Sequence, residues 1–85
     1  MSTTLSVNNL PLTATEDGLA AKFAQFGTVL TARVNRDPAT GRSLRSGLVE
    51  MKSSGEAQTA IDRLNLADYD GRLMSVTRAV RRVSN

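Results

Sequence analysis

The sequence predicts an α+β domain with two helices packed on one face of a four-stranded antiparallel sheet. Four short segments carry apolar side chains at alternate positions, which is typical of half-buried strands. Two further segments carry apolar side chains at helical spacing, each behind a Ser or Thr that suits a helix N-cap. The order along the chain is β-α-β-β-α-β, and right-handed crossovers place both helices on the same face. The predicted architecture is therefore ferredoxin-like, with the other sheet face open.

The first strand and the first helix are expected over residues 4–10 and 15–26. In the strand, Leu5 and Val7 alternate with polar residues, and Pro11 helps to end it because proline cannot donate to a ladder. The apolar stripe of the helix has i, i+4 and i+7 spacing and consists of Leu19, Phe23 and Phe26.

Two positions are open for the start of this helix. Thr15 is a plausible N-cap with acidic residues in the first turn, whereas Thr13 to Glu16 has the spacing of a capping box. Gly27 follows the last apolar position and is expected to be the C′ glycine that ends the helix.

The second and third strands are expected over residues 29–35 and 44–51, joined by a loop with a turn at 37–41. A bulge near Val29 would decide which way Leu30 points. The predicted inward side chains are Ala32, Val34, Gly47, Val49 and Met51, and the outward ones are Thr31, Arg33, Asn35, Leu44, Ser46, Leu48 and Glu50. Gly47 lies on the inward side, where its lack of a side chain lets another group pack closely.

A second capping box at residues 53–56 begins the second helix, which is followed by a connector at 65–71 and a last strand at 72–79. The apolar stripe of the helix consists of Ala57, Ala60, Ile61 and Leu64. In the last strand Met74 and Val76 are expected to point inward, and Leu73, Ser75 and Thr77 outward. The domain is expected over residues 4–80, and a short basic tail over 81–85.

Composition limits the possible chemistry. The chain of 85 residues is long enough for one domain, and its net charge of +3 favours polyanionic partners. It has no cysteine and no histidine, and no nucleophile–base pair can be assembled, so an enzyme is not expected. No apolar run is long enough to span a membrane and no signal peptide is visible, so we expect an intracellular location, cytoplasmic rather than nuclear.

The third strand resembles the longer signature of the RNA recognition motif family, K/R-G-F/Y-G/A-F-V-x-F/Y, and aligns with it over residues 44–51 without gaps. Residues 5–10 resemble the shorter signature on the first strand, and residues 71–79 resemble the closing strand of the family. The resemblance covers residues 4–80. The departures are Leu44 and Arg45 in place of a basic residue and glycine, and Ser6, Ser46 and Leu48 in place of the aromatic side chains that stack on bases.

The resemblance implies binding of single-stranded RNA, with single-stranded DNA as a second ligand. Family members usually stack two or three bases on sheet aromatics, but Phe23, Phe26 and Tyr69 are all expected away from the open face. Binding is therefore predicted to be weak and led by charge, without a cofactor or a metal ion. The candidate residues are Ser6, Asn8, Arg33, Asn35, Arg42, Arg45, Ser46, Leu48, Glu50, Ser75, Thr77, Arg78 and Arg81.

An alternative function is protein–protein interaction through the open sheet face or the helices. Leu44, Leu48 and Leu73 are predicted to be outward-facing and to form an apolar strip that binds a protein partner or a second copy. The acidic pair Asp68 and Asp70 has too few further oxygen ligands for a calcium loop and is interpreted as a solvated turn.

Overall fold

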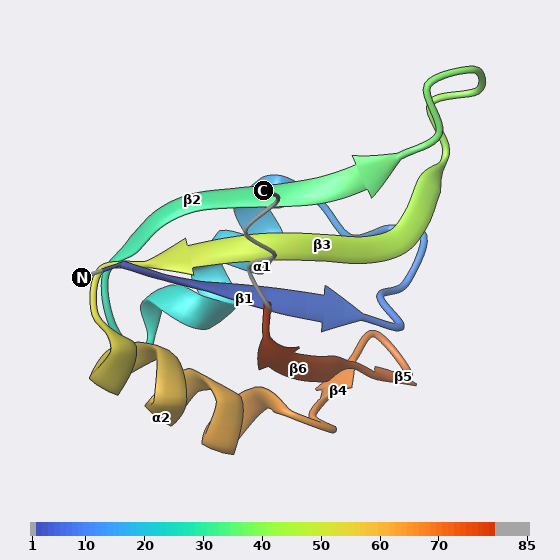
Figure 1. Ribbon diagram of the computed structural model, residues 1–85. Coiled ribbons are helices and arrows are strands. Elements are labelled where there is room, and N and C mark those ends of the chain that lie inside the picture. The colour runs from blue at the N-terminus through green and yellow to red at the C-terminus, as the bar shows by residue number, and fades with distance from the viewer. Residues whose placement is uncertain (1, 80–85) are drawn as a thin grey trace.

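The structure is a computed structural model that describes residues 2–79 (Figure 1). The predicted basic tail, including Arg81, lies outside the described residues. The elements in chain order are β1 (Thr3–Asn8), α1 (Glu16–Ala24), β2 (Val29–Arg36), β3 (Ser43–Met51), α2 (Ser54–Leu64), β4 (Asp68–Tyr69), β5 (Arg72–Leu73) and β6 (Ser75–Arg78).

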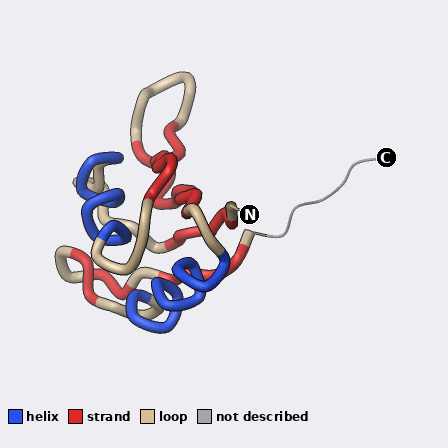
Figure 2. Tube along the Cα trace, turned by 90° about the vertical axis from the view of Figure 1, so that its left-hand side faces the viewer, coloured by secondary structure: helices blue, strands red, loops and turns tan. Residues whose placement is uncertain are grey.

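The main sheet has four antiparallel strands in the order β2-β3-β1-β6, which confirms the predicted fold class. The two strands that carry the family signatures, β1 and β3, lie side by side at its centre (Figure 1). The loop between β2 and β3 projects away from the rest of the domain in both overall views (Figure 2).

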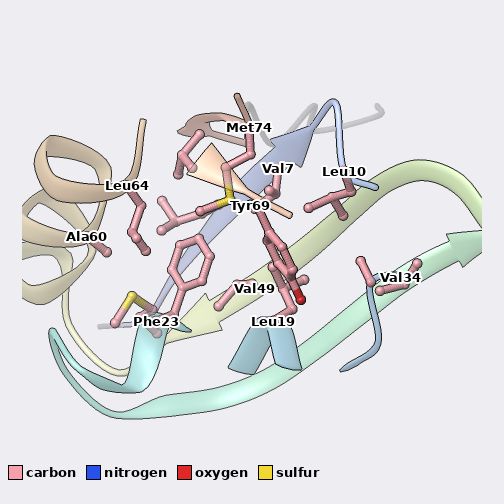
Figure 3. Packing of buried hydrophobic residues seen from close by; sticks show 14 of the residues in the cluster. Val7, Leu10, Leu19, Phe23, Val34, Val49, Ala60, Leu64, Tyr69 and Met74 are labelled. Atoms are coloured by element: carbon pink, nitrogen blue, oxygen red, sulfur yellow. The ribbon is translucent and has the colours of Figure 1, made fainter. Parts of the chain in front are cut away.

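Both helices and the inward side chains of the sheet share one hydrophobic core (Figure 3). Phe23 and Leu19 of α1 are fully buried against Leu5, Val49 and other inward residues of the sheet. Burying each large apolar side chain stabilises the fold by about 1.5–3 kcal/mol. The core explains the alternation, because the predicted inward residues of β1 and β3 are all buried.

The register between β2 and β3 is interrupted at two places. The first lies between Val29 and Thr31, as expected, and it leaves Leu30 half exposed. The second lies between Val34 and Arg36 and was not predicted. There β3 contains two more residues than β2, and Arg45 within this β3 segment adopts a left-handed backbone conformation with φ of 62°. This is the position where the family signature has glycine.

Gly47 lets the β2 backbone pack closely against β3, as predicted from its inward position in the strand. An added Cβ would lie 2.3 Å from the carbonyl oxygen of Arg33 and 3.2 Å from Cδ2 of Leu19. Because the first of these is a backbone atom in a paired strand, any side chain at this position would push β2 and β3 apart.

The last strand is shorter than predicted. Asp70 and Gly71 both have positive φ and join β4 to β5 in a tight hairpin, which suits an Asp-Gly turn. Met74 then leaves the strand ladder: its N–H donates to the Ala67 carbonyl and its carbonyl accepts from the Leu66 N–H. Residues 72–79 therefore divide into β5, paired with β4, and β6, paired with β1.

The helix ends also differ in part from the prediction. Thr15 is the N-cap of α1 and accepts from the Gly18 N–H at 3.1 Å, so the rival start at Thr13 is not used. Gly27 does not have positive φ and is not the C′ residue, because α1 ends at Ala24 with Gln25 as its C-cap.

Close packing explains the glycine instead. A Cβ on Gly27 would lie 2.5 Å from Cβ of Glu56. Ser53 caps α2 by accepting from the Glu56 N–H, as predicted, but the Glu56 carboxylate accepts from the Thr28 N–H at 3.2 Å rather than completing the capping box at Ser53.

Replacing Arg45 with glycine is expected to raise the free energy of unfolding by about 0.5–1 kcal/mol. The left-handed conformation costs a non-glycine residue about 1–2 kcal/mol, and glycine loses about 0.5–1 kcal/mol in backbone entropy. Denaturant unfolding measures the difference. Gly41→Ala is the matched control, since Gly41 has φ of 76° with open space around it and should lose stability for the same reason. If Arg45→Gly instead lowers the free energy of unfolding, the backbone of Arg45 is not strained.

Candidate nucleic-acid interface

The open face of the sheet consists of side chains aligned in rows across the strands. The register pairs Leu48 of β3 with Ser6 of β1 on one side and with Arg33 of β2 on the other, and Ser6 with Thr77 of β6. The neighbouring rows are Thr31, Glu50 and Thr4 at one end and Ser46, Asn8 and Ser75 at the other. Asn35 joins the second of these rows by donating from Nδ2 to Oγ of Ser46 at 3.0 Å.

This arrangement brings most of the predicted site residues together on one surface. They are Ser6, Asn8, Arg33, Asn35, Ser46, Leu48, Glu50, Ser75 and Thr77. Hydroxyl and amide groups dominate the surface, and each is able to donate and accept hydrogen bonds. Thr4 and Thr31 belong to the same face but were not among the predicted binding residues, although alternation along their strands would have found them.

No aromatic ring lies on this face. Phe23 and Tyr69 are buried in the core (Figure 3), and Phe26 is partly buried against it. The three positions of the missing rings are close together, because Ser6 is directly opposite Leu48 and Ser46 is two residues from Leu48 on the same strand. The face has the layout of a stacking platform without the rings.

Basic charge is concentrated in one segment of the chain, which runs from β2 through the loop into β3. Residues 33–45 contain four arginines and one aspartate, whereas the rest of the described chain contains five basic and seven acidic residues. Within the described chain, the side chains of Arg33, Arg42 and Arg45 make no hydrogen bond or ion pair with another residue. These three guanidinium groups therefore keep all their donors for a ligand.

Other arginines are occupied by contacts within the domain. Arg36 forms an ion pair with Glu16 at 3.4 Å, and Arg72 donates to Oδ1 of Asn9. Arg78 donates to Oε1 of Gln58 at 3.0 Å and to the Ser54 carbonyl at 3.4 Å, which directs it to α2 and away from the open face. The structure thus does not bring Arg78 together with the other predicted binding residues.

The three predicted leucines do not form a continuous apolar strip. Leu48 is 37% exposed, and its neighbours on the open face are the polar residues Ser6, Arg33, Ser46 and Glu50. Leu44 lies within the irregular segment of β3, and Leu73 belongs to the separate β4–β5 hairpin.

Glu16 has a role that the sequence did not show. Its carboxylate accepts from the backbone N–H of Val34 at 3.1 Å, in addition to its ion pair with Arg36. Because β2 is an edge strand, this bond satisfies a donor that has no strand partner. The hydrogen bond from Val34, with backbone N–H of Glu16 itself and Arg36 as smaller causes, lowers the pKa of Glu16 below its ordinary value.

None of the helices in residues 2–79 is long and apolar enough to cross a bilayer. Over the same residues, no group of three or more acidic side chains is placed to hold a metal ion. Asp68 and Asp70 lie on either side of Tyr69 in the hairpin, and Asp70 accepts from the Thr13 hydroxyl at 3.4 Å.

The fold and the two central strands define an RNA recognition motif. The family model described as "RNA recognition motif" matches residues 5–75 of this chain. The chain therefore belongs to the RNA recognition motif family, as the signatures on β1 and β3 predicted.

Curated relatives and solved structures agree with this assignment. The chain is 42% identical over 80 residues to the chloroplastic 31 kDa ribonucleoprotein of Nicotiana sylvestris, and that match covers 92% of this chain and 25% of the ribonucleoprotein. It is 40% identical over 73 residues to the putative RNA-binding protein RbpA of Nostoc, covering 86% of this chain and 72% of RbpA. The crystal structure of RNA Binding Protein PG1 superimposes with a TM-score of 0.90 at 35% identity, covering 96% of this chain and 99% of that one.

Replacing Glu16 with glutamine should make the stability of the domain less dependent on pH in the acid range. Because the folded-state pKa of Glu16 is lowered, its ionised form stabilises the fold above the unfolded-state pKa, and this contribution is lost as the pH falls through the folded-state value. The wild type should therefore be the more stable protein at neutral pH, and the difference should shrink between about pH 5 and pH 3. Thermal unfolding over this range measures it, and a difference that stays constant would exclude the ionised carboxylate as the cause.

Proposed function

We propose that this domain binds single-stranded RNA on its open sheet face, through arginine–phosphate contacts and hydrogen bonds rather than base stacking. The observation that carries the proposal is the polar open face with Arg33 in its central row, together with Arg45 on β3 and Arg42 in the loop before β3, none of which is bound to another described residue. Membership of the RNA recognition motif family supports it, as do relatives named as RNA-binding proteins and a structural relative described as a Sex-lethal protein/RNA complex (TM-score 0.85, 37% identity).

The absence of aromatic rings from the open face determines the affinity for RNA that we propose. Stacking one base on an aromatic side chain is worth about 1–3 kcal/mol. Without it, affinity depends on contacts with phosphates, which are screened by salt, and on hydrogen bonds with a small net value of about 0.5–1.5 kcal/mol each. Binding should therefore be weak and strongly dependent on ionic strength.

Several finer features follow the same reasoning. Phosphate contacts do not distinguish RNA from DNA, so we propose single-stranded DNA as a second ligand. We also propose that the domain binds its ligand without catalysis. We further propose an intracellular location, where RNA is available, and the cytoplasm rather than the nucleus. The chain spans a quarter of the 31 kDa ribonucleoprotein, so the partners of longer relatives are not transferred to it. The polar surroundings of Leu48 give no support to a protein interface on this face.

The first test measures the salt dependence of binding to a mixed-sequence oligonucleotide. Each phosphate contact on a single strand contributes a slope of about −0.7 in log affinity against log salt. Replacing Arg42 and Arg45 with alanine should flatten the slope by about 1–1.5 units. The control is a double variant of Lys52 and Arg63, which removes the same charge from two side chains outside residues 33–45. Equal slopes for the two double variants would show that Arg42 and Arg45 do not contact phosphate.

The second test restores the rings. The triple variant Ser6→Tyr, Ser46→Phe and Leu48→Phe should bind single-stranded RNA more tightly by a few kcal/mol, less than the sum of about 1–3 kcal/mol per stacked base. The gain should be similar for different sequences, because every base has a π-face, and the salt slope should hardly change. Stability should change little, since these side chains point away from the core. A folded triple variant without increased affinity would contradict RNA binding on the open face.

A further inference from the structure

Glu50 is the one acidic side chain in the rows of the open face described above. The register places it between Thr4 of β1 and Thr31 of β2, next to Leu48 along the face of β3. Its carboxylate makes no hydrogen bond or ion pair with any other residue in the described chain, although Arg33 is a diagonal neighbour. The acid is therefore held on the central strand of the proposed binding surface without a protein donor.

A carboxylate at this place is unfavourable for a purely charge-led site. It repels the phosphates that the neighbouring arginines attract, and it accepts hydrogen bonds but does not donate them. A ligand offsets this cost only by supplying N–H or O–H donors. Glu56 and Glu16 differ in this respect, since each accepts a hydrogen bond from a backbone N–H of the domain.

The bases of a single strand differ in the donors that they offer. The Watson–Crick edges are free in single-stranded RNA and are read by side chains. Guanine has two adjacent donors on this edge, N1–H and the N2 amino group, and both can reach the two oxygens of one carboxylate. Adenine and cytosine each offer one amino group beside an acceptor, and uracil offers a single N–H between two carbonyls.

We infer that Glu50 makes the open face selective for guanine, by accepting from N1–H and N2–H of a base that lies over β3. This inference rests on the proposed RNA-binding function and adds a base preference to it. The neighbouring hydroxyls of Thr4 and Thr31 supply further donors and acceptors around the same base. Specificity then comes from the carboxylate, and most of the affinity comes from the arginines.

The experiment combines one substitution in the protein with one atom-level change in the RNA. Two uridine heptamers carry either guanosine or inosine at the centre, and inosine differs from guanosine only by lacking the N2 amino group. Wild-type protein should bind the guanosine heptamer about tenfold more tightly, the size expected for loss of a bidentate pair. Glu50→Gln should remove most of this difference, because the neutral amide is no longer a bidentate acceptor.

Asp62→Asn is the control for net charge, since Asp62 is an exposed acid on α2 whose side chain forms a hydrogen bond only with Gln58 within the described chain. It should keep the preference for guanosine. If Glu50→Gln instead strengthens binding to both heptamers equally and leaves their ratio unchanged, Glu50 acts only by repulsion and the inference is wrong. Equal affinity of the wild type for both heptamers would also overturn the inference while leaving the proposed function intact. If the wild type binds neither heptamer nor mixed-sequence RNA, the proposed function fails, and the inference with it.

Discussion

The pairing of β1 with β3 determines which side chains form the core and which form the open face. Val7 opposite Gly47 is a buried pair, and Ser6 opposite Leu48 is an outward pair. Because successive side chains alternate, a slip of one residue would exchange the two faces. The pairing of β3 with β2 is fixed as well, because a slip of one residue there would bring a Cβ up to the Arg33 carbonyl, where only the glycine at position 47 fits. The two registers together determine the packing of the core and the composition of the face.

Features that depend on burial could be predicted from the sequence. The alternation of Leu5 and Val7 and the spacing of Leu19 and Phe23 reflect contact with one hydrophobic core, so they identify strands and helices without knowledge of the partner. Features that depend on particular distant hydrogen bonds could not. Residues 72–79 have the pattern of one strand, but Met74 pairs its backbone with residues 66 and 67. Gly27 has the position of a C′ glycine, but it is needed because Glu56 packs against it.

In the candidate site, too, some features could be predicted from the sequence and others could not. Alternation was enough to place Ser6, Asn8, Ser46 and Leu48 on one face, because the register carries them there as a group. The availability of charged groups was not readable from the sequence. Arg78 is bound by Gln58, and Glu16 is bound to Val34, through contacts that span 20 and 18 residues of chain. A count of basic residues therefore overstates the charge that is free for a ligand, since Arg36, Arg72 and Arg78 are bound within the domain whereas Arg33, Arg42 and Arg45 are not bound to another described residue.

A face with this composition favours discrimination over affinity. Each hydrogen bond to a base replaces one to water and adds only about 0.5–1.5 kcal/mol, but a polar group left without a partner in a bound complex costs about 1–3 kcal/mol. Aromatic rings have the opposite balance, since stacking adds affinity to any base and penalises none. On the proposed binding face, serine and leucine in place of the rings would lower the affinity for all sequences, and hydrogen bonds to the bases would then make up a larger share of the binding energy. The fold permits this exchange because the outward positions of β1 and β3 contribute no side chain to the core.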